Sequence, residues 1–288
     1  METYKDSLIA EELQREYRRL LDRWPVPSEQ LRVPTGQGET FVVACGPAGA
    51  PPLVLLHGAI ANSASWMGDA AGLSERFRVY AVDVIGEAGL SAPARPPLAS
   101  DAYAAWLDDV LDGLGVDRAA FAGISLGGWL ALDYAIRRPD RVDRLVVLNP
   151  GGVGRQRWGA VLLSVVLLPF GRWGRRVAVG RALGAALPGP FMDYFLRLQA
   201  AFRPRREVLP VFGDAALRGI RAPLLAVLGG RDALLDAAGT RRRLEALVPH
   251  ATVRFLPGAG HAVTGQTDDV LAFLTAQPPS ARMPNVSP

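Results

Sequence analysis

The 288-residue sequence contains only one cysteine and three histidines. A single cysteine excludes an internal disulfide, and the position of Cys45 in the apolar run Phe41–Cys45 favours a buried strand residue over a reactive thiol. The histidines, His57, His250 and His261, lie far apart in the chain and have no cysteine partner. The sequence therefore predicts neither a structural zinc site nor any other metal site.

Export signals, long apolar segments and dinucleotide fingerprints are also missing. Residues 1–24 are charged and have helical periodicity, which is not the pattern of an export signal, so we expect a cytoplasmic location. The longest nearly continuous apolar run, Trp158–Phe170, has 13 residues and is shorter than the roughly 20 that span a bilayer. We therefore predict no stable membrane insertion. No G-x-G-x-x-G pattern follows a predicted strand, and we expect no cofactor.

Acidic residues are nearly absent from one segment of the chain. Residues 155–206 contain ten arginines and a single acid, Asp193, although the whole chain has a net charge of only +4. This segment does not combine its charge with base-stacking aromatics on a recognisable binding fold, so no nucleic-acid partner is predicted. The arginines fit three roles: solubilising a lid, attracting substrates with a carboxylate or phosphate, or contacting an anionic membrane surface.

The remaining composition is that of a globular protein, with 49% hydrophobic and 21% charged residues. Short apolar runs, bounded by Gly, Pro or Asp, predict strands at Phe41–Cys45, Leu53–Leu56, Val79–Val82, Ala119–Ala122, Leu145–Leu148, Leu224–Leu228 and Thr252–Leu256. Between them, helical periodicity predicts helices at Ala102–Leu114, Leu126–Arg138, Thr240–Leu247 and Asp268–Thr275. This alternation predicts an α/β fold with a mostly parallel central sheet flanked by helices.

Two segments depart from the alternation. An amphipathic helix precedes it and ends at the breaker Trp24–Pro27. Residues 151–215 interrupt it and are interpreted as an inserted helical cap. We therefore expect a core in two parts, residues 1–150 and 216–276, with the cap, residues 151–215, between them. A mobile tail rich in Pro and Ser follows at residues 277–288.

The strongest chemical motif is Gly-Ile-Ser-Leu-Gly at residues 123–127, directly between a predicted strand and a predicted helix. In this context G-x-S-x-G predicts a nucleophile elbow, where a strained turn exposes the hydroxyl of Ser125 above the sheet. The N-terminus of the following helix favours an oxyanion beside the serine. The alternative interpretation is a serine that only caps the helix.

A serine nucleophile needs a histidine base, and that base needs a carboxylate to orient it. His261 lies in a glycine-bearing loop after the last predicted strand, and Asp232 follows the strand Leu224–Leu228. The order Ser125, Asp232, His261 is the order expected for a triad on this type of α/β fold. Asp236 is the second candidate for the acid, whereas Asn149, after another strand, cannot serve.

The oxyanion hole requires two backbone N–H donors. One is predicted at Leu126, directly after the nucleophile. The other is predicted at Ala59, in the loop that follows the strand Leu53–Leu56. In this interpretation His57 is a structural residue that bonds loop backbone. Residues 83–91 form a second loop element, in which Asp83 and Ser91 satisfy backbone groups.

Together these segments resemble the α/β-hydrolase superfamily over nearly the whole chain outside the cap, and most closely its bacterial carboxylesterase-like members. The resemblance implies Ser125 as nucleophile, Asp232 as acid, His261 as base, and Ala59 with Leu126 as oxyanion donors. The sequence departs from the lipase type because it lacks a glycine-rich oxyanion loop. This departure argues against large triglyceride substrates.

The cap also offers apolar residues for a substrate pocket. Candidates for binding an acyl group are Ile60 before the cap and, within it, Trp158, Phe191, Met192, Tyr194, Phe195 and Leu198. The alternative is that the cap merely covers the edge of the sheet.

The sequence therefore predicts a serine hydrolase that cleaves a carboxylic ester or related acyl bond through an acyl-enzyme, with a small acyl molecule and water as partners. Serine at position 125 disfavours dehalogenases and epoxide hydrolases, which use aspartate there. Thioesterase, lactonase, carbon–carbon bond hydrolase and cofactor-free haloperoxidase activities share the triad and stay open, as does a ligand-binding protein with little turnover. No feature of the sequence indicates an oligomeric state.

Overall fold

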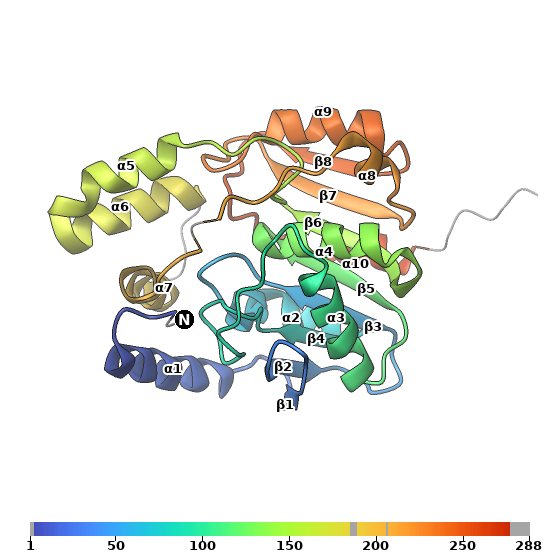
Figure 1. Cartoon of the computed structure of the whole chain (residues 1–288), viewed down its shortest axis with the longest axis horizontal. Helices are drawn as coiled ribbons and strands as arrows, with labels where there is room; N and C mark the ends of the chain where they lie inside the picture. The colour runs from blue at the N-terminus through green and yellow to red at the C-terminus, as the bar shows by residue number, and fades with distance from the viewer. Residues whose placement is uncertain (1–2, 185–188, 206, 277–288) are drawn as a thin grey trace, which may run out of the picture.

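A computed structural model describes residues 3–184, 189–205 and 207–276 of the chain (Figure 1). Its centre is one sheet in which the described strands follow the order β1-β2-β4-β3-β5-β6-β7-β8. The strands are β1 Ser28–Val33, β2 Thr40–Cys45, β3 Pro52–Leu56, β4 Arg78–Val82, β5 Ala119–Ile124, β6 Val142–Leu148, β7 Leu224–Gly229 and β8 Thr252–Leu256. The pairs β1–β2 and β2–β4 are antiparallel, and every pair from β4 to β8 is parallel.

The mostly parallel α/β sheet predicted from the sequence is confirmed, and each of the seven predicted strands is present. The prediction missed β1, because most of its residues face solvent and its sequence, SEQLRV, has no apolar run. It is an edge strand that pairs only with β2. Such a strand forms through its ladder to a buried neighbour, so its own sequence carries little signal.

Helices cover both faces of the sheet. The helices outside the β6–β7 connection are α1 Ser7–Leu21, α2 Met67–Ser74, α3 Ala102–Gly113, α4 Leu126–Arg137, α9 Ala237–Leu247 and α10 Thr267–Thr275. Those within it are α5 Gly159–Leu167, α6 Gly171–Leu183, α7 Gly189–Ala201 and α8 Asp214–Arg218. The sequence had not predicted α2, a short helix rich in small residues.

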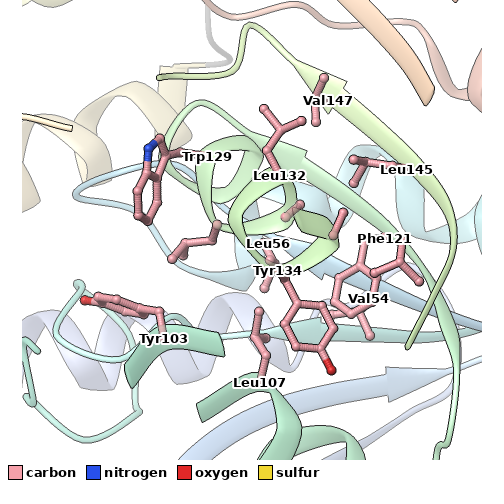
Figure 2. Close-up of a cluster of buried hydrophobic side chains, with 14 of the residues drawn as sticks. Val54, Leu56, Tyr103, Leu107, Phe121, Trp129, Leu132, Tyr134, Leu145 and Val147 are labelled. Atoms are coloured by element: carbon pink, nitrogen blue, oxygen red, sulfur yellow. The ribbon is translucent and has the colours of Figure 1, made fainter. Parts of the chain in front are cut away.

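The core lies in two layers separated by the sheet. Along β3, Val54 and Leu56 belong to one buried cluster, while Leu53 and Leu55 belong to the other, because successive strand residues point to opposite faces. Helices α3, α4, α8 and α9 contribute to the first cluster, part of which Figure 2 shows. Helices α1, α2, α7 and α10 contribute to the second. Both faces of β3 are therefore fully covered, as a parallel central strand requires.

The segment predicted as a cap, residues 151–215, contains α5, α6 and α7 and ends within α8. Helices α5 and α6 form a hairpin away from the sheet (Figure 1). Helix α7 packs against α1, where Arg197 forms ion pairs of 2.6 Å with both Glu12 and Glu16. The predicted mobile tail, 277–288, lies outside the described residues. Each helix in the described part of the chain is too short or too polar to serve as a transmembrane span.

Helix α1 offers a matched test of what attaches the N-terminus to the core. Leu13 is fully buried on its inner face, and Leu8 is 72% exposed on the same helix. Leu13→Ala is expected to lower the free energy of unfolding by about 2–5 kcal/mol, because it removes buried methyl groups and leaves a cavity. Leu8→Ala should change it by less than about 0.5 kcal/mol. Urea unfolding of both variants tests this, and equal effects would contradict the docking of α1.

Candidate active site

The turn between β5 and α4 is strained and tightly enclosed. Ser125 has φ +53° and ψ −107°, a conformation that L-residues other than glycine rarely adopt. Its N–H donates to the carbonyl of Leu148 at the end of β6, over 3.0 Å. A Cβ on Gly123 would lie 2.3 Å from the Gly127 carbonyl oxygen, and one on Gly127 would lie 2.1 Å from the Leu56 carbonyl oxygen. Both glycines are therefore required for this close approach.

His261 and Asp232 form a buried pair at the carboxyl ends of β8 and β7. The distance between His261 Nδ1 and Asp232 Oδ2 is 2.7 Å, and Asp232 is only 1% exposed. The other oxygen, Oδ1, accepts the N–H groups of Leu234 and Leu235 at 2.7 and 3.0 Å. Because the carboxylate accepts at Nδ1, this contact assigns the proton of the neutral ring to Nδ1 and leaves Nε2 free as a base.

The second candidate for the acid has a different position. Asp236 caps the N-terminus of α9, where its side chain accepts the N–H of Gly239 over 3.0 Å. This is the ordinary role of an aspartate before a helix. The structure thus brings Asp232, and not Asp236, into contact with His261.

Asn149 connects the two loops that carry the pair, which the sequence analysis did not foresee. Its Nδ2 donates to the carbonyls of Gly260 and His261 at 3.0 and 2.8 Å, and its Oδ1 accepts the Gly229 N–H at 2.8 Å. The residue itself has φ +42°. Its position after β6 places it at the right edge of the sheet, where an asparagine cannot serve as the acid but can bind both loops.

His57 begins the loop after β3 and is fully buried. Its Nε2 accepts the Val84 N–H over 2.9 Å, so Nδ1 carries the proton and donates to the Gly58 carbonyl over 2.8 Å. Burial lowers the pKa of His57, although Asp83 and the Gly58 bond oppose this shift, and the neutral ring is favoured. This agrees with the structural role predicted for His57.

The predicted oxyanion donors lie beside the elbow. A Cβ placed on Gly58 would be 3.6 Å from the Cβ of Ser125, so the loop passes directly alongside the serine. Ala59 is the next residue of this loop and is exposed. Leu126 is the first residue of α4, and the first N–H groups of a helix have no partner within it.

Glu87 binds the loop that contains Ala59 and Ile60, a second contact that was not predicted from the sequence. Ile60 has φ +55°, which is rare for a β-branched residue, and its N–H donates to Glu87 Oε2 over 2.7 Å. Burial raises the pKa of Glu87 to about 7, against the opposing effects of the Ile60 N–H and of Arg95 and Arg205. The signal available was an acid among the small and apolar residues of the loop 83–91.

Asp83 organises the loop elements around this site. Its Oδ1 accepts from the Tyr17 hydroxyl over 2.8 Å and from the Ser63 N–H and hydroxyl over 2.8 and 2.7 Å. Its Oδ2 accepts the Leu90 N–H over 2.8 Å, and the Ser91 hydroxyl donates to its carbonyl over 2.6 Å. The predicted backbone-satisfying roles of Asp83 and Ser91 are confirmed. The same carboxylate also ties α1 to the sheet edge.

The predicted substrate-binding residues differ in exposure. Ile60, Phe191 and Phe195 are half-buried, and Trp158 is exposed. Tyr194 is only 4% exposed, and its hydroxyl accepts from the Asn62 amide over 2.9 Å. The half-buried side chains and Trp158 are therefore accessible to a ligand, whereas Tyr194 lies mainly within the core.

A largely apolar cavity of about 400 Å³ lies between the α5–α6 hairpin and the residue after Asp232. Its lining includes Arg157, Gly159, Leu163, Arg181 and Ala233.

In the described part of the chain, no three His, Cys, Asp or Glu side chains converge as metal ligands would.

Comparisons with known proteins point to one family. Residues 51–173 match the model of a family described as alpha/beta hydrolase fold. The chain is 30% identical to the uncharacterized carboxylesterase nap of Bacillus subtilis, over 91% of either chain. It is 32% identical to carboxylesterase YbfK of the same organism, over 90% of this chain and 92% of the relative. The crystal structure of carboxylesterase CesB (YbfK) from Bacillus subtilis has a TM-score of 0.82 at 30% identity, and the match covers 93% of this chain and 98% of that one.

Glu87→Gln is expected to stabilise the protein above neutral pH. Between the ordinary pKa of 4.5 and the raised value of about 7, the folded protein keeps a proton that the unfolded chain releases. Stability is therefore lost as pH rises through this window, by up to about 3 kcal/mol. Glutamine is always neutral and keeps an oxygen for the Ile60 N–H. Urea unfolding across about pH 5 to 8.5 measures the slope.

Glu75→Gln, at an exposed position, is the matched control and should leave the slope unchanged. If wild type and Glu87→Gln had the same dependence on pH, Glu87 would not carry the buried proton.

Proposed function

Because the chain belongs to the α/β-hydrolase superfamily as a carboxylesterase-like member, we propose that this esterase-type hydrolase uses a serine triad and an acyl-enzyme intermediate. The observation that supports the proposal most is the buried contact of 2.7 Å between His261 and Asp232, at the sheet edge that also carries the strained Ser125. A histidine oriented by a carboxylate is what a serine hydroxyl needs in order to react.

Acylation is the first step. His261 Nε2 takes the proton of Ser125 Oγ as this oxygen attacks the carbonyl carbon of the ester. The negative charge moves to the carbonyl oxygen, and the N–H groups of Ala59 and Leu126 bind it there. The bond to the alkoxy oxygen then breaks, and His261 gives its proton to the departing alcohol.

Deacylation repeats these steps with water as the nucleophile. His261 takes a proton from water, whose oxygen attacks the acyl carbon and forms a second oxyanion. Collapse of this intermediate releases the carboxylic acid, and the proton returns to Ser125 Oγ. Asp232 stays ionised throughout, holds the tautomer of the ring and stabilises the imidazolium that forms twice in each cycle.

The proposed substrate is a small molecule with an apolar acyl group. Ile60, Phe191 and Phe195 are half-buried and are proposed to contact it, and Tyr194 supports them from the core. The more exposed Trp158 is not assigned to this contact. Their surfaces suit hydrocarbon rather than charge.

Ser125→Ala is expected to abolish turnover of p-nitrophenyl esters, because no other group replaces the attacking hydroxyl. A panel from acetate to long acyl chains, measured on wild type and variant in parallel, should show serine-dependent hydrolysis with a maximum at one chain length. Turnover that persisted in Ser125→Ala would overturn the nucleophile. If wild type hydrolysed no ester, thioesters, lactones and carbon–carbon substrates would be tested next, as would binding without turnover.

Asp232→Asn is expected to lower kcat on the best ester by a factor on the order of 10⁴, the size of this effect in serine proteases. Asn cannot hold the tautomer that leaves Nε2 free. Asp236→Asn is the matched control, because asparagine caps a helix as well as aspartate does and kcat should stay near that of wild type. An inactive Asp236→Asn beside an active Asp232→Asn would reverse the assignment of the acid.

A further inference from the structure

An apolar stripe runs along the outer face of α5. It begins at Trp158, and its other residues follow four, seven, eight and twelve positions later, so they share one side of a helical segment. Trp173 on α6 extends the stripe, with its ring 6.0 Å from that of Phe170 in an edge-to-face contact. The side chains of this hairpin patch are between 55% and 66% exposed: Trp158, Leu162, Val165, Val166, Phe170 and Trp173.

The α5–α6 hairpin projects from the rest of the fold. Helix α5 packs chiefly on α6, and Figure 1 shows both helices extending away from the sheet. The end of α6 is attached to the loop of His261, where the Ala262 N–H donates to the Leu183 carbonyl over 2.8 Å. The hairpin patch is therefore an exposed apolar surface on a projecting element, next to the proposed active site.

Positive charge surrounds this patch. Arg172, Arg175 and Arg176 flank Trp173 on α6, and all three are exposed. Arg172 and Arg176 share one carboxylate, that of Asp193, at 3.2 and 3.3 Å. Because Asp193 is the only acid in residues 155–206, the surroundings of the patch have a net positive charge.

This charge argues against a second copy of the chain as the occupant. Two hairpin patches facing each other would bring their guanidinium groups together, at a cost in repulsion. A surface that offers both hydrocarbon and negative charge satisfies the apolar and the cationic groups together. Tryptophans at the border, such as Trp158 and Trp173, suit the level of lipid headgroups.

We propose that the α5–α6 hairpin binds the surface of an anionic phospholipid bilayer, with the hairpin patch among the outer acyl carbons and the arginines at the lipid phosphates. Binding of this kind is peripheral and reversible, since it needs no span of the bilayer. The proposal goes beyond ester hydrolysis and uses none of the triad residues. Because its test measures vesicle binding, the bilayer proposal can fail while the proposed ester hydrolysis is upheld, and the proposed ester hydrolysis can fail while vesicle binding is observed.

The experiment is flotation of the full chain with vesicles of phosphatidylcholine alone or with a quarter phosphatidylglycerol. Wild type is expected to float with the anionic vesicles and to dissociate at high salt, which screens the charges. Leu162→Gln with Val166→Gln should lower partitioning at least about tenfold, because the buried apolar area is lost. Leu8→Gln with Val211→Gln, at exposed apolar positions outside the hairpin, is the control and should bind as wild type does.

The charge is tested separately by Arg172→Gln with Arg175→Gln, which should weaken binding by at least about fivefold. Arg218→Gln with Arg242→Gln, at exposed positions on α8 and α9, removes the same charge elsewhere and should have little effect. Thermal melts monitored by circular dichroism establish that each variant folds.

Three outcomes would overturn the proposal: no binding to anionic vesicles, equal binding to neutral ones, or equal losses in the control variants. A dimer in sedimentation velocity that Leu162→Gln with Val166→Gln converts to monomer would also overturn it, in favour of a second copy of the chain.

Discussion

The close contact between the β5–α4 turn and its neighbouring strands is the constraint on which the site depends. A serine at φ +53° costs about 1–3 kcal/mol and persists only where the surroundings enforce it. The carbonyl of Leu148 binds its N–H from one side, and the carbonyl of Leu56 approaches Gly127 from the other. The two parallel strands that flank β5, β3 and β6, thus hold the turn, and the loops at their carboxyl ends necessarily lie around Ser125.

Buried polar side chains then fix these loops to one another. Each of four side chains binds a backbone N–H or carbonyl group in a loop segment other than its own: Asp83, His57, Asn149 and Glu87. Side chains that bind backbone set the position of a loop more narrowly than apolar packing does, because hydrogen bonds are directional. Burial of the ionised Glu87 carboxylate carries a cost that increases as pH rises, whereas the amide of Asn149 is neutral at every pH.

The fold was predictable from the sequence where burial is periodic. Strands such as β3, β5 and β7 are covered on both faces, and their apolar runs mark them without reference to any partner. Strand β1 forms because β2 offers it a ladder, and its exposed side chains leave no such pattern. The hairpin of α5 and α6 presents the opposite case: its apolar run was interpreted as part of a cap, and the structure leaves the outer face of the run exposed, because α5 packs chiefly on α6.

The sequence by itself determined the alternation of strands and helices, the strained Gly-Ile-Ser-Leu-Gly turn and the short set of candidate residues, because local periodicity and turn chemistry encode these. Only the tertiary structure shows that Asp232, and not Asp236, contacts His261, since the two lie four positions apart and differ in what the folded chain places beside them. The hydrogen-bond partners of Asn149 and Glu87 likewise came only from the folded chain, because they lie 111 and 27 positions away. A hydrogen bond between distant segments leaves no periodic trace in a single sequence.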